Sequence, residues 1–211
     1  MTKREEALAK MKAYIETDGE YKGCIHIEDA YIIPGSKNFT GVEKRDRNNP
    51  KKIVNSEGNR NFSIEITREI ADLIANYRLV DHPDKAFKVS VKLPDANAED
   101  QTERIFMTVK LKYNYDDKGN PWRNNPKIRQ YSAKKATEKD ESNVHTIDDV
   151  FIDKAEIIFA PGPYDVNGYT GLTAWLRKLN YKIKEDDMDS KWDMDYVTDD
   201  PTDIPEELPF D

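Results

Sequence analysis

The sequence predicts a mainly β (α+β) protein, an OB-fold-like small β-barrel with inserted short helices, long loops and an acidic C-terminal tail. Three observations favour this fold class. Five or six short segments alternate apolar and polar side chains, as half-buried strands do. Short helical patterns stand between some of these segments, and the apolar periodicity stops beyond residue 184. Many short strands combined with few helices are typical of a small barrel.

The first element is predicted to be a helix over residues 3–16. Thr2 and Glu5 have the spacing of a capping box, in which each side chain bonds to the other residue's backbone N–H. An apolar stripe at helical spacing follows, made of Leu8, Met11 and Ile15.

Two strands and a second helix come next. Residues 23–34 (GCIHIEDAYIIP) and 62–66 (FSIEI) alternate, and Thr67 can cap the helix that follows the second of them. Residues 34–61 lack periodicity and are rich in Gly, Asn, Lys and Arg, so they predict a long basic loop. The apolar positions are Ile25, Ile27, Tyr31 and Ile33 in the first strand and Ile70, Leu73, Ile74 and Tyr77 in the helix.

The second half of the chain predicts three more strands and a helix. Residues 87–93 (FKVSVKL) and 105–115 (IFMTVKLKYNY) have core faces on their odd positions, and 150–161 (VFIDKAEIIFAP) is a further strand. Residues 116–122 (DDKGNPW) form a turn. Residues 170–179 (TGLTAWLRKL) are predicted as a short helix. Its apolar side chains are Leu172, Trp175, Leu176 and Leu179.

The chain length suits one domain, residues 1–184, followed by an interaction tail, residues 185–211. Hydrophobic residues make up 37% of the chain and charged residues 35%, so a core is expected beneath a highly charged surface. The single cysteine, Cys24, excludes an internal disulfide framework. No apolar run is long enough to cross a bilayer. We therefore expect a cytoplasmic protein without a membrane partner.

Charge is distributed very unevenly along the chain. Residues 185–211 hold twelve acids and one base, Lys191, a net charge of −11. The first 184 residues hold 29 acids and 32 bases, a net charge of +3. The overall net charge of −8 therefore conceals a mildly basic body that carries a strongly acidic, disordered tail.

The body carries cations interleaved with aromatic side chains, which is the pattern that binding of single strands requires. Mobile cations meet phosphates, and exposed rings stack on unpaired bases. The alternative reading is that these lysines only solvate the outer face of a strand. The candidate DNA-binding residues are Phe39, Lys44, Arg45, Arg47, Lys51, Lys52, Arg60, Phe106, Lys110, Lys112, Trp122, Arg123, Lys127, Arg129 and Tyr131.

Catalytic patterns are weak by comparison. The histidines are scattered, no second cysteine exists for a zinc site, and phosphate-binding glycine loops are missing from the sequence. The pairs Asp116-Asp117 and Asp148-Asp149 could hold Mg²⁺ in a nuclease, yet neither comes with a third catalytic group. We therefore expect binding without enzymatic activity, with no cofactor and no metal.

The tail ends in an apolar tip that solubility alone does not require. Its sequence DIPEELPFD resembles the acidic tails of bacterial and phage single-stranded DNA-binding proteins, although Asp211 follows Phe210 here. Residues 155–179 (AEIIFAPGPYDVNGYTGLTAWLRKL) are similar to the C-terminal part of the phage proteins.

This resemblance implies an OB-fold core that binds single-stranded DNA with little sequence preference. It implies a tail that recruits replication or recombination proteins and competes with DNA for the basic groove, and it allows a homodimer. The tail-tip residues carried over are Asp203, Ile204, Glu206, Glu207, Leu208, Pro209 and Phe210. The alternative is an acidic interaction protein, such as a DNA mimic that binds a basic host protein.

Overall fold

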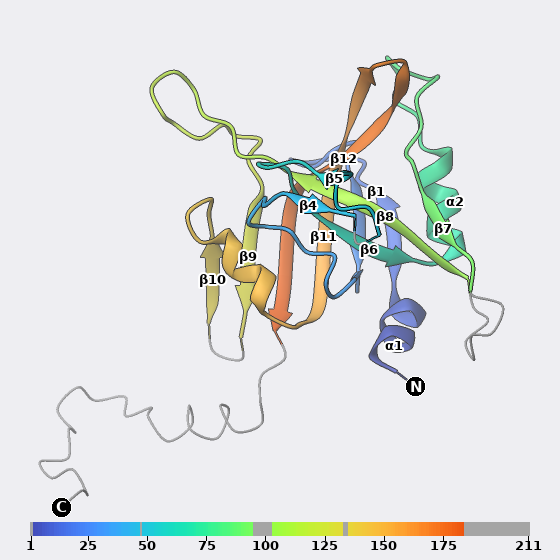
Figure 1. Ribbon diagram of the computed structural model, residues 1–211, viewed down its shortest axis with the longest axis horizontal. Coiled ribbons are helices and arrows are strands. Elements are labelled where there is room, and N and C mark those ends of the chain that lie inside the picture. Colours follow the sequence, from blue (N-terminus) through green and yellow to red (C-terminus); the bar gives the residue numbers. More distant parts are fainter. Residues whose placement is uncertain (1, 47, 95–102, 133–134, 184–211) are drawn as a thin grey trace, which may run out of the picture.

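The computed structural model describes residues 2–46, 48–94, 103–132 and 135–183. Within them lie two α-helices, one 3-10 helix and twelve strands (Figure 1). The elements are α1 (Lys3–Lys10), β1 (Lys12–Ile15), β2 (Ile25–Glu28), β3 (Tyr31–Ile32), β4 (Lys44–Arg45), β5 (Ile53–Asn55), β6 (Arg60–Ile66), α2 (Arg68–Asn76), β7 (Ser90–Lys92), β8 (Arg104–Leu111), β9 (Lys127–Tyr131), β10 (Ala136–Lys139), η1 (Val144–Asp149), β11 (Ile152–Val166) and β12 (Tyr169–Ile183). The predicted mainly β class with short helices is confirmed.

The central sheet closes on itself. Its hydrogen-bonded order runs β2-β11-β12-β8-β6-β3, and β2 and β3 are separated in the chain by Asp29 and Ala30 alone. Asp29 has a φ of 50°, a left-handed conformation that aspartate tolerates, and it bends the segment between its two partner strands. The N–H of Ala30 still donates to the carbonyl of Ala155 on β11, at 2.8 Å. The ladder therefore returns to its starting segment and encloses a small barrel.

The barrel interior is filled by the inward-facing apolar side chains of these strands. Phe62 and Phe159 are completely buried, and Phe39 from the loop after β3 stacks on Phe62 with 5.2 Å between ring centroids. The predicted core positions on β8 are confirmed as buried from Ile105 to Leu111. The alternation of β8 ends at Leu111 because the chain leaves the barrel there as a projecting loop.

The two predicted helix starts are confirmed. Thr2 and Glu5 form the capping box of α1, and the Thr67 hydroxyl accepts from the N–H of Ile70 in α2. The first helix is shorter than predicted, because it ends at Lys10 and residues 12–15 form β1. Strand β1 pairs with β2 along its whole length, and this backbone pairing outweighs the helical spacing of Ile15.

The predicted helix over residues 170–179 is wrong. This segment is part of β12, which pairs with β11 from end to end. Arg177 is an extra residue in the ladder, a β-bulge that shifts the register between Leu176 and Lys178. The buried positions therefore run 172, 174 and 176 and then 179 and 181. The bulge turns one spacing of two into a spacing of three, which imitates a helical pattern.

The strand predicted over residues 87–93 is confirmed only at residues 90–92. Phe87 is buried and forms a bridge with Leu172 of β12, whereas Ser90, Val91 and Lys92 pair with β8. Because the segment changes its partner strand, its alternation breaks, and Val91 and Leu93 are exposed rather than in the core.

The loop between β3 and β6 is held in place by buried polar groups. Asn38 is buried, and its side-chain amide donates to the carbonyls of Val42 and Asn59 at 3.1 and 3.3 Å. The Asp148 carboxylate of η1 accepts from the backbone N–H groups of Phe39 and Thr40. A loop without apolar periodicity is therefore ordered by hydrogen bonds, and it includes the short β4–β5 hairpin.

Helix α1 is fixed to the barrel by an ion cluster. Glu65 on β6 is only 1% exposed and accepts from Arg4 Nε at 2.8 Å and from Arg104 Nη2 at 2.6 Å. Burial raises the pKa of this carboxyl, but the hydrogen bonds from Arg4 and Arg104 outweigh burial and hold its pKa below the ordinary value.

In the described part of the chain, no helix is long and apolar enough to span a membrane.

We expect Glu65→Gln to lower the free energy of unfolding at pH 7 by about 3–5 kcal/mol, because two arginines lose their buried anion. The folded-state pKa of Glu65 lies below its unfolded value, so its stabilisation is full above the unfolded pKa and is lost as pH falls through the folded pKa. Wild-type stability should therefore fall more steeply than that of the variant as the solution is acidified. Urea unfolding between pH 7 and pH 3 measures both effects.

Glu103→Gln is the matched control, since the Arg68–Glu103 ion pair is exposed. It should change stability by less than about 1 kcal/mol. Equal losses for the two variants would contradict the role given to Glu65.

Candidate nucleic-acid interface

The outer face of the barrel places an aromatic ring beside a lysine. Trp175 of β12 is the parallel partner of Lys110 on β8, and the preceding pair, Ala174 and Val109, points into the core. Trp175 and Lys110 therefore share the solvent-facing side of the sheet. Lys110 is exposed, and Trp175 keeps 36% of its surface accessible.

Trp175 lies directly on the backbone of the neighbouring strand. A Cβ atom built on Gly162 of β11 would be 2.3 Å from Cδ1 and 2.4 Å from Nε1 of the indole. Glycine at position 162 therefore lets the ring lie against β11 while the rest of the ring faces solvent. The sequence reading missed Trp175 as a site residue because it placed this tryptophan on the apolar face of a helix.

A pocket of about 360 Å³ opens next to this tryptophan. One wall is loop 112–126, and the other consists of β11 and β12. Arg177, the bulge residue, reaches across and donates to Asn124 Oδ1 at 2.8 Å. The lining residues are Lys112, Asn114, Asn124, Ala160, Pro161, Trp175, Leu176 and Arg177. The pocket thus combines an aromatic surface with two cations.

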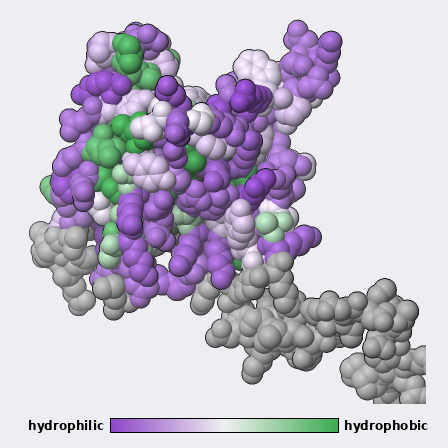
Figure 2. Space-filling view, turned by 180° about the vertical axis from the view of Figure 1, so that it is seen from behind, coloured by the Kyte–Doolittle hydropathy of each residue, from purple (hydrophilic) through white to green (hydrophobic). Residues whose placement is uncertain are grey.

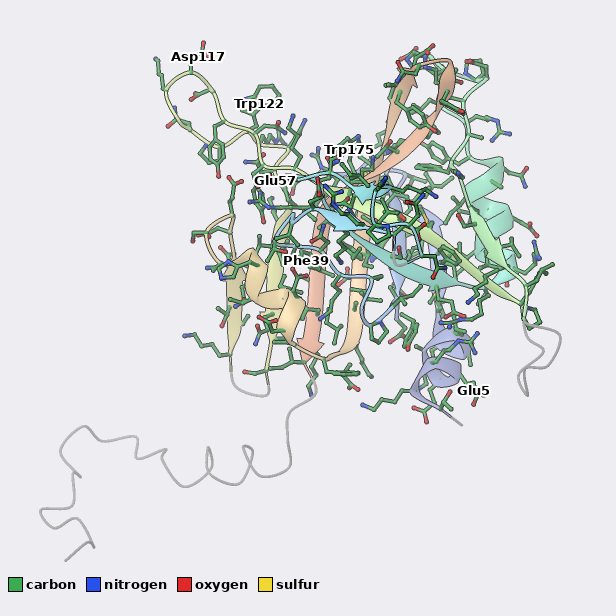
Figure 3. All side chains as sticks on the ribbon, in the orientation of Figure 1. Glu5, Phe39, Glu57, Asp117, Trp122 and Trp175 are labelled. Atoms are coloured by element: carbon green, nitrogen blue, oxygen red, sulfur yellow. The ribbon has the colours of Figure 1, made fainter. Side chains whose placement is uncertain are left out.

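Loop 112–126 is a projecting β-turn structure. The Asp116 carboxylate accepts from the backbone N–H groups of Lys118 and Asn120, and the N–H of Trp122 donates to the carbonyl of Asn114 at 2.9 Å. The predicted turn over residues 116–122 is confirmed. Trp122 is 54% exposed on this loop, and Figure 3 shows the loop standing above the level of Trp175.

Two projections rise from the same end of the barrel, loop 112–126 and the tip of the β11–β12 hairpin (Figure 1). Trp175 lies between their bases (Figure 3). The view from behind shows both projections above a surface that is mostly hydrophilic but carries a hydrophobic patch below the projection on the left (Figure 2). The hairpin tip adds a third exposed aromatic ring, Tyr169.

Many of the predicted cations are neutralised by neighbouring carboxylates. Ion pairs join Arg45 to Glu43, Lys52 to Asp46, Arg60 to Glu141, Lys127 to Glu20 and Arg129 to Glu138. By contrast, Lys51, Lys110, Lys112 and Arg123 form no ion pair with any residue that the structure describes. Three of these four, all but Lys51, belong to β8 or to loop 112–126.

Glu20 lies at the edge of this group. The hydrogen bond from Lys127 is the main cause that holds the Glu20 pKa below its ordinary value, and the nearby charges of Arg123 and Arg177 act in the same direction. The charge of Glu20 therefore acts on Arg177, which lines the Trp175 pocket, and on Arg123 of loop 112–126.

The prediction of Phe39 as a DNA-binding residue is wrong, and several other predicted residues lie away from Trp175. Phe39 is completely buried against Phe62, so its ring cannot stack on a base. Lys44 donates to the carbonyl of Lys37. Phe106 is half-buried opposite Glu65, four residues or about 13 Å along β8 from Lys110. Tyr131 is partly exposed on β9, which runs parallel to β12. Arg47 and the tail from Asp203 to Phe210 lie outside the described residues.

Two aspartate pairs were considered above as metal ligands. In each pair the first aspartate has a structural role. Asp116 fixes the turn of loop 112–126, and Asp148 anchors the loop at Phe39 and Thr40. Among the residues whose placement is known, no three His, Cys, Asp or Glu side chains gather closely enough to hold a metal ion.

The sequence matches the model of a known protein family. A family model described as "Putative phage ssDNA-binding domain" matches residues 20–210. Among solved structures, the single-stranded DNA-binding protein from bacteriophage Enc34 in complex with ssDNA aligns with 8% identity and a TM-score of 0.41. That alignment covers 83% of this chain and 97% of the Enc34 chain. No curated protein matches this chain in sequence.

We expect Gly162→Ala to destabilise the protein by about 1–3 kcal/mol, because the added methyl group overlaps the Trp175 indole. The same substitution in a Trp175→Ala background should cost much less, since the overlapping ring is gone. Urea unfolding of the two single variants and the double variant measures this coupling. Additive losses would mean that the indole does not depend on Gly162.

Proposed function

The chain belongs to the phage single-stranded DNA-binding domain family, and from this premise we propose that it binds single-stranded DNA without base-sequence preference during phage DNA replication, recombination or repair. The observation that carries the proposal is the Trp175 indole. It lies against the backbone of Gly162 and is flanked by lysines without ion-pair partners among the described residues. We propose that it acts in the cytoplasm of the bacterial host.

The geometry suits stacking and phosphate binding together. A base that stacks on Trp175 contributes about 1–3 kcal/mol whatever its identity, because every base has a π-face. Lys110, Lys112 and Arg177 surround this ring, so the phosphates on either side of the stacked base meet cations. Trp122 and Tyr169, exposed on the two projections, supply further rings for neighbouring bases.

Binding rather than catalysis is the role that this arrangement supports. The closed barrel holds the ring and the cations in fixed positions, and a DNA-binding role needs no reactive group. We further propose that the closed path from β2 through β11, β12, β8 and β6 to β3 corresponds to an OB-fold barrel, in which the sheet face and the flanking loops bind oligonucleotides.

The acidic tail is proposed to regulate this site and to recruit proteins. Its net charge of −11 opposes that of the body, so it can compete with DNA phosphates for the cations around Trp175. When DNA occupies the groove, the tail tip becomes available to replication or recombination proteins. Cations on such a partner would meet the acids around the apolar residues Leu208 and Phe210.

A fluorescent oligo-dT of about 30 nucleotides should bind tightly, and a duplex of the same length much more weakly. The affinity should fall with salt, because bound lysines and arginines release counterions from the single strand. Lys110→Ala should reduce the slope of log K against log salt by about 0.7. Trp175→Ala should weaken binding by about 1–3 kcal/mol at every salt concentration. Fluorescence anisotropy at several salt concentrations measures all these effects.

Phe151→Ala serves as the control, since Phe151 is exposed and lies outside the Trp175 pocket. It should leave the affinity unchanged. Failure of the wild-type chain to bind oligo-dT, both with and without residues 199–211, would refute the proposed function.

Removal of residues 199–211 should leave the affinity for oligo-dT unchanged or raise it. The six acids of this stretch would then no longer compete with phosphates: Asp199, Asp200, Asp203, Glu206, Glu207 and Asp211. The same anisotropy titration at low salt tests this expectation. Clearly weaker binding by the shortened chain would contradict competition between tail and DNA.

A further inference from the structure

Loop 112–126 has a pocket on each of its two sides. Lys112 and Asn114 line the Trp175 pocket, while Tyr113 and Tyr115 line a second pocket of about 620 Å³. This division follows from extended backbone, in which successive side chains point in opposite directions. A bridge between Tyr115 and Pro121 keeps the two arms of the loop together. The two pockets are therefore separated by the width of a single two-stranded ribbon.

The second pocket has an apolar and aromatic interior. Its floor is Ile128 of β9, and its far wall is the end of β10 with the turn that follows. The apolar lining consists of Tyr113, Tyr115, Pro121, Pro126 and Ile128. Three cations and three carboxylates balance each other around these residues: Lys127, Arg129, Lys139, Glu138, Asp140 and Glu141. A pocket that is neutral in sum and aromatic inside suits an uncharged planar group better than a phosphate.

Tyr113 brings an unused hydrogen-bonding group to this pocket. Its hydroxyl is buried and finds no partner among the described residues. Burial is the main cause that raises the pKa of this hydroxyl far above its ordinary value, so it stays protonated and able to donate. A buried polar group without a partner costs about 1–3 kcal/mol, which a ligand with an acceptor atom would recover.

The tyrosine ring itself is held firmly. The Arg60 guanidinium lies over it, 5.6 Å from the ring centroid, and Arg60 is in turn paired with Glu141. Because Arg60 comes from β6 and Glu141 from the turn after β10, two distant segments fix the position of the Tyr113 ring before any ligand arrives. The pocket is therefore preorganised.

A cation, Arg123, lies between the two pockets. Arg123 lies on the loop that separates them, and it has no ion-pair partner in the described part of the chain. Lys127 lines the second pocket but is paired with Glu20. Because Arg123 lies on the loop between the pockets, a strand that leaves the Trp175 pocket can cross the loop with a phosphate near Arg123.

We propose that the second pocket receives one base of the bound single strand, with the Tyr113 hydroxyl donating to a carbonyl or ring nitrogen of that base. The strand then crosses loop 112–126, with bases on both of its sides and Arg123 on the phosphate between them. This inference rests on the proposed function and extends the DNA path beyond the face of the barrel.

The test uses the full chain and oligo-dT of about 30 nucleotides. Tyr115→Ala, which removes a pocket ring, should lower the affinity about 5- to 150-fold. Tyr113→Phe, which keeps the ring and removes the hydroxyl, should lower it about 2- to 10-fold. Phe151→Ala is the control for an exposed ring outside both pockets and should have no effect.

A second measurement does not depend on the folding of variants. Oligo-dT that contains 4-thiothymidine is irradiated with the wild-type protein, and the cross-linked peptides are mapped. Cross-links at Tyr113 or Tyr115 would support the proposal. Cross-links at Trp175 without any in the second pocket, together with unchanged affinity of Tyr113→Phe, would overturn it and leave the proposed function intact. Failure of the wild-type protein to bind would overturn both.

Discussion

The pairing of β11 with β12 is the constraint on which the rest of the structure depends. Two strands of fifteen residues each form a continuous antiparallel ladder, and β11 also pairs with β2 while β12 pairs with β8 and β9. The barrel closes because this hairpin joins β2 to β8. The same ladder places Trp175 opposite Ala160, two positions from the Gly162–Thr173 pair, so the indole can lie over the glycine backbone. The fold and the candidate interface therefore share one structural cause.

The bulge at Arg177 links that ladder to the site. An extra residue in β12 locally increases the twist of the strand and changes the direction in which its side chains point. Arg177 itself donates to Asn124 of loop 112–126 and ties the loop to the barrel at the edge of the Trp175 pocket. A regular strand would keep the alternation begun at Leu172 and would place residue 178, rather than Leu179, in the core.

Some surface cations are paired with carboxylates and others are not. Carboxylates hold Arg45, Arg60 and Arg129 in fixed positions, and such pairs limit the attraction of these cations for phosphate. The lysines that follow the core residues of β8 lack such partners among the described residues. The electrostatic attraction of the body is thus concentrated where exposed aromatic rings also lie, rather than spread over the entire basic sequence.

The sequence by itself determined the mainly β class, the capped starts of both helices, the core face of β8 and the separation of a basic body from an acidic tail. These features depend on residues near one another in the chain, so local periodicity, capping and charge reveal them. Alternation and turn composition also predicted correctly that Lys110, Lys112 and Trp122 face solvent. Only the tertiary structure decided that Phe39 is buried, that residues 170–179 form a strand and that Trp175 faces outward. Each of these depends on a partner far away in sequence: Phe62 for Phe39, β11 for β12 and Gly162 for Trp175. Pairing between distant segments fixes which side of a strand faces the core, and a single bulge changes that side without altering the composition of the segment.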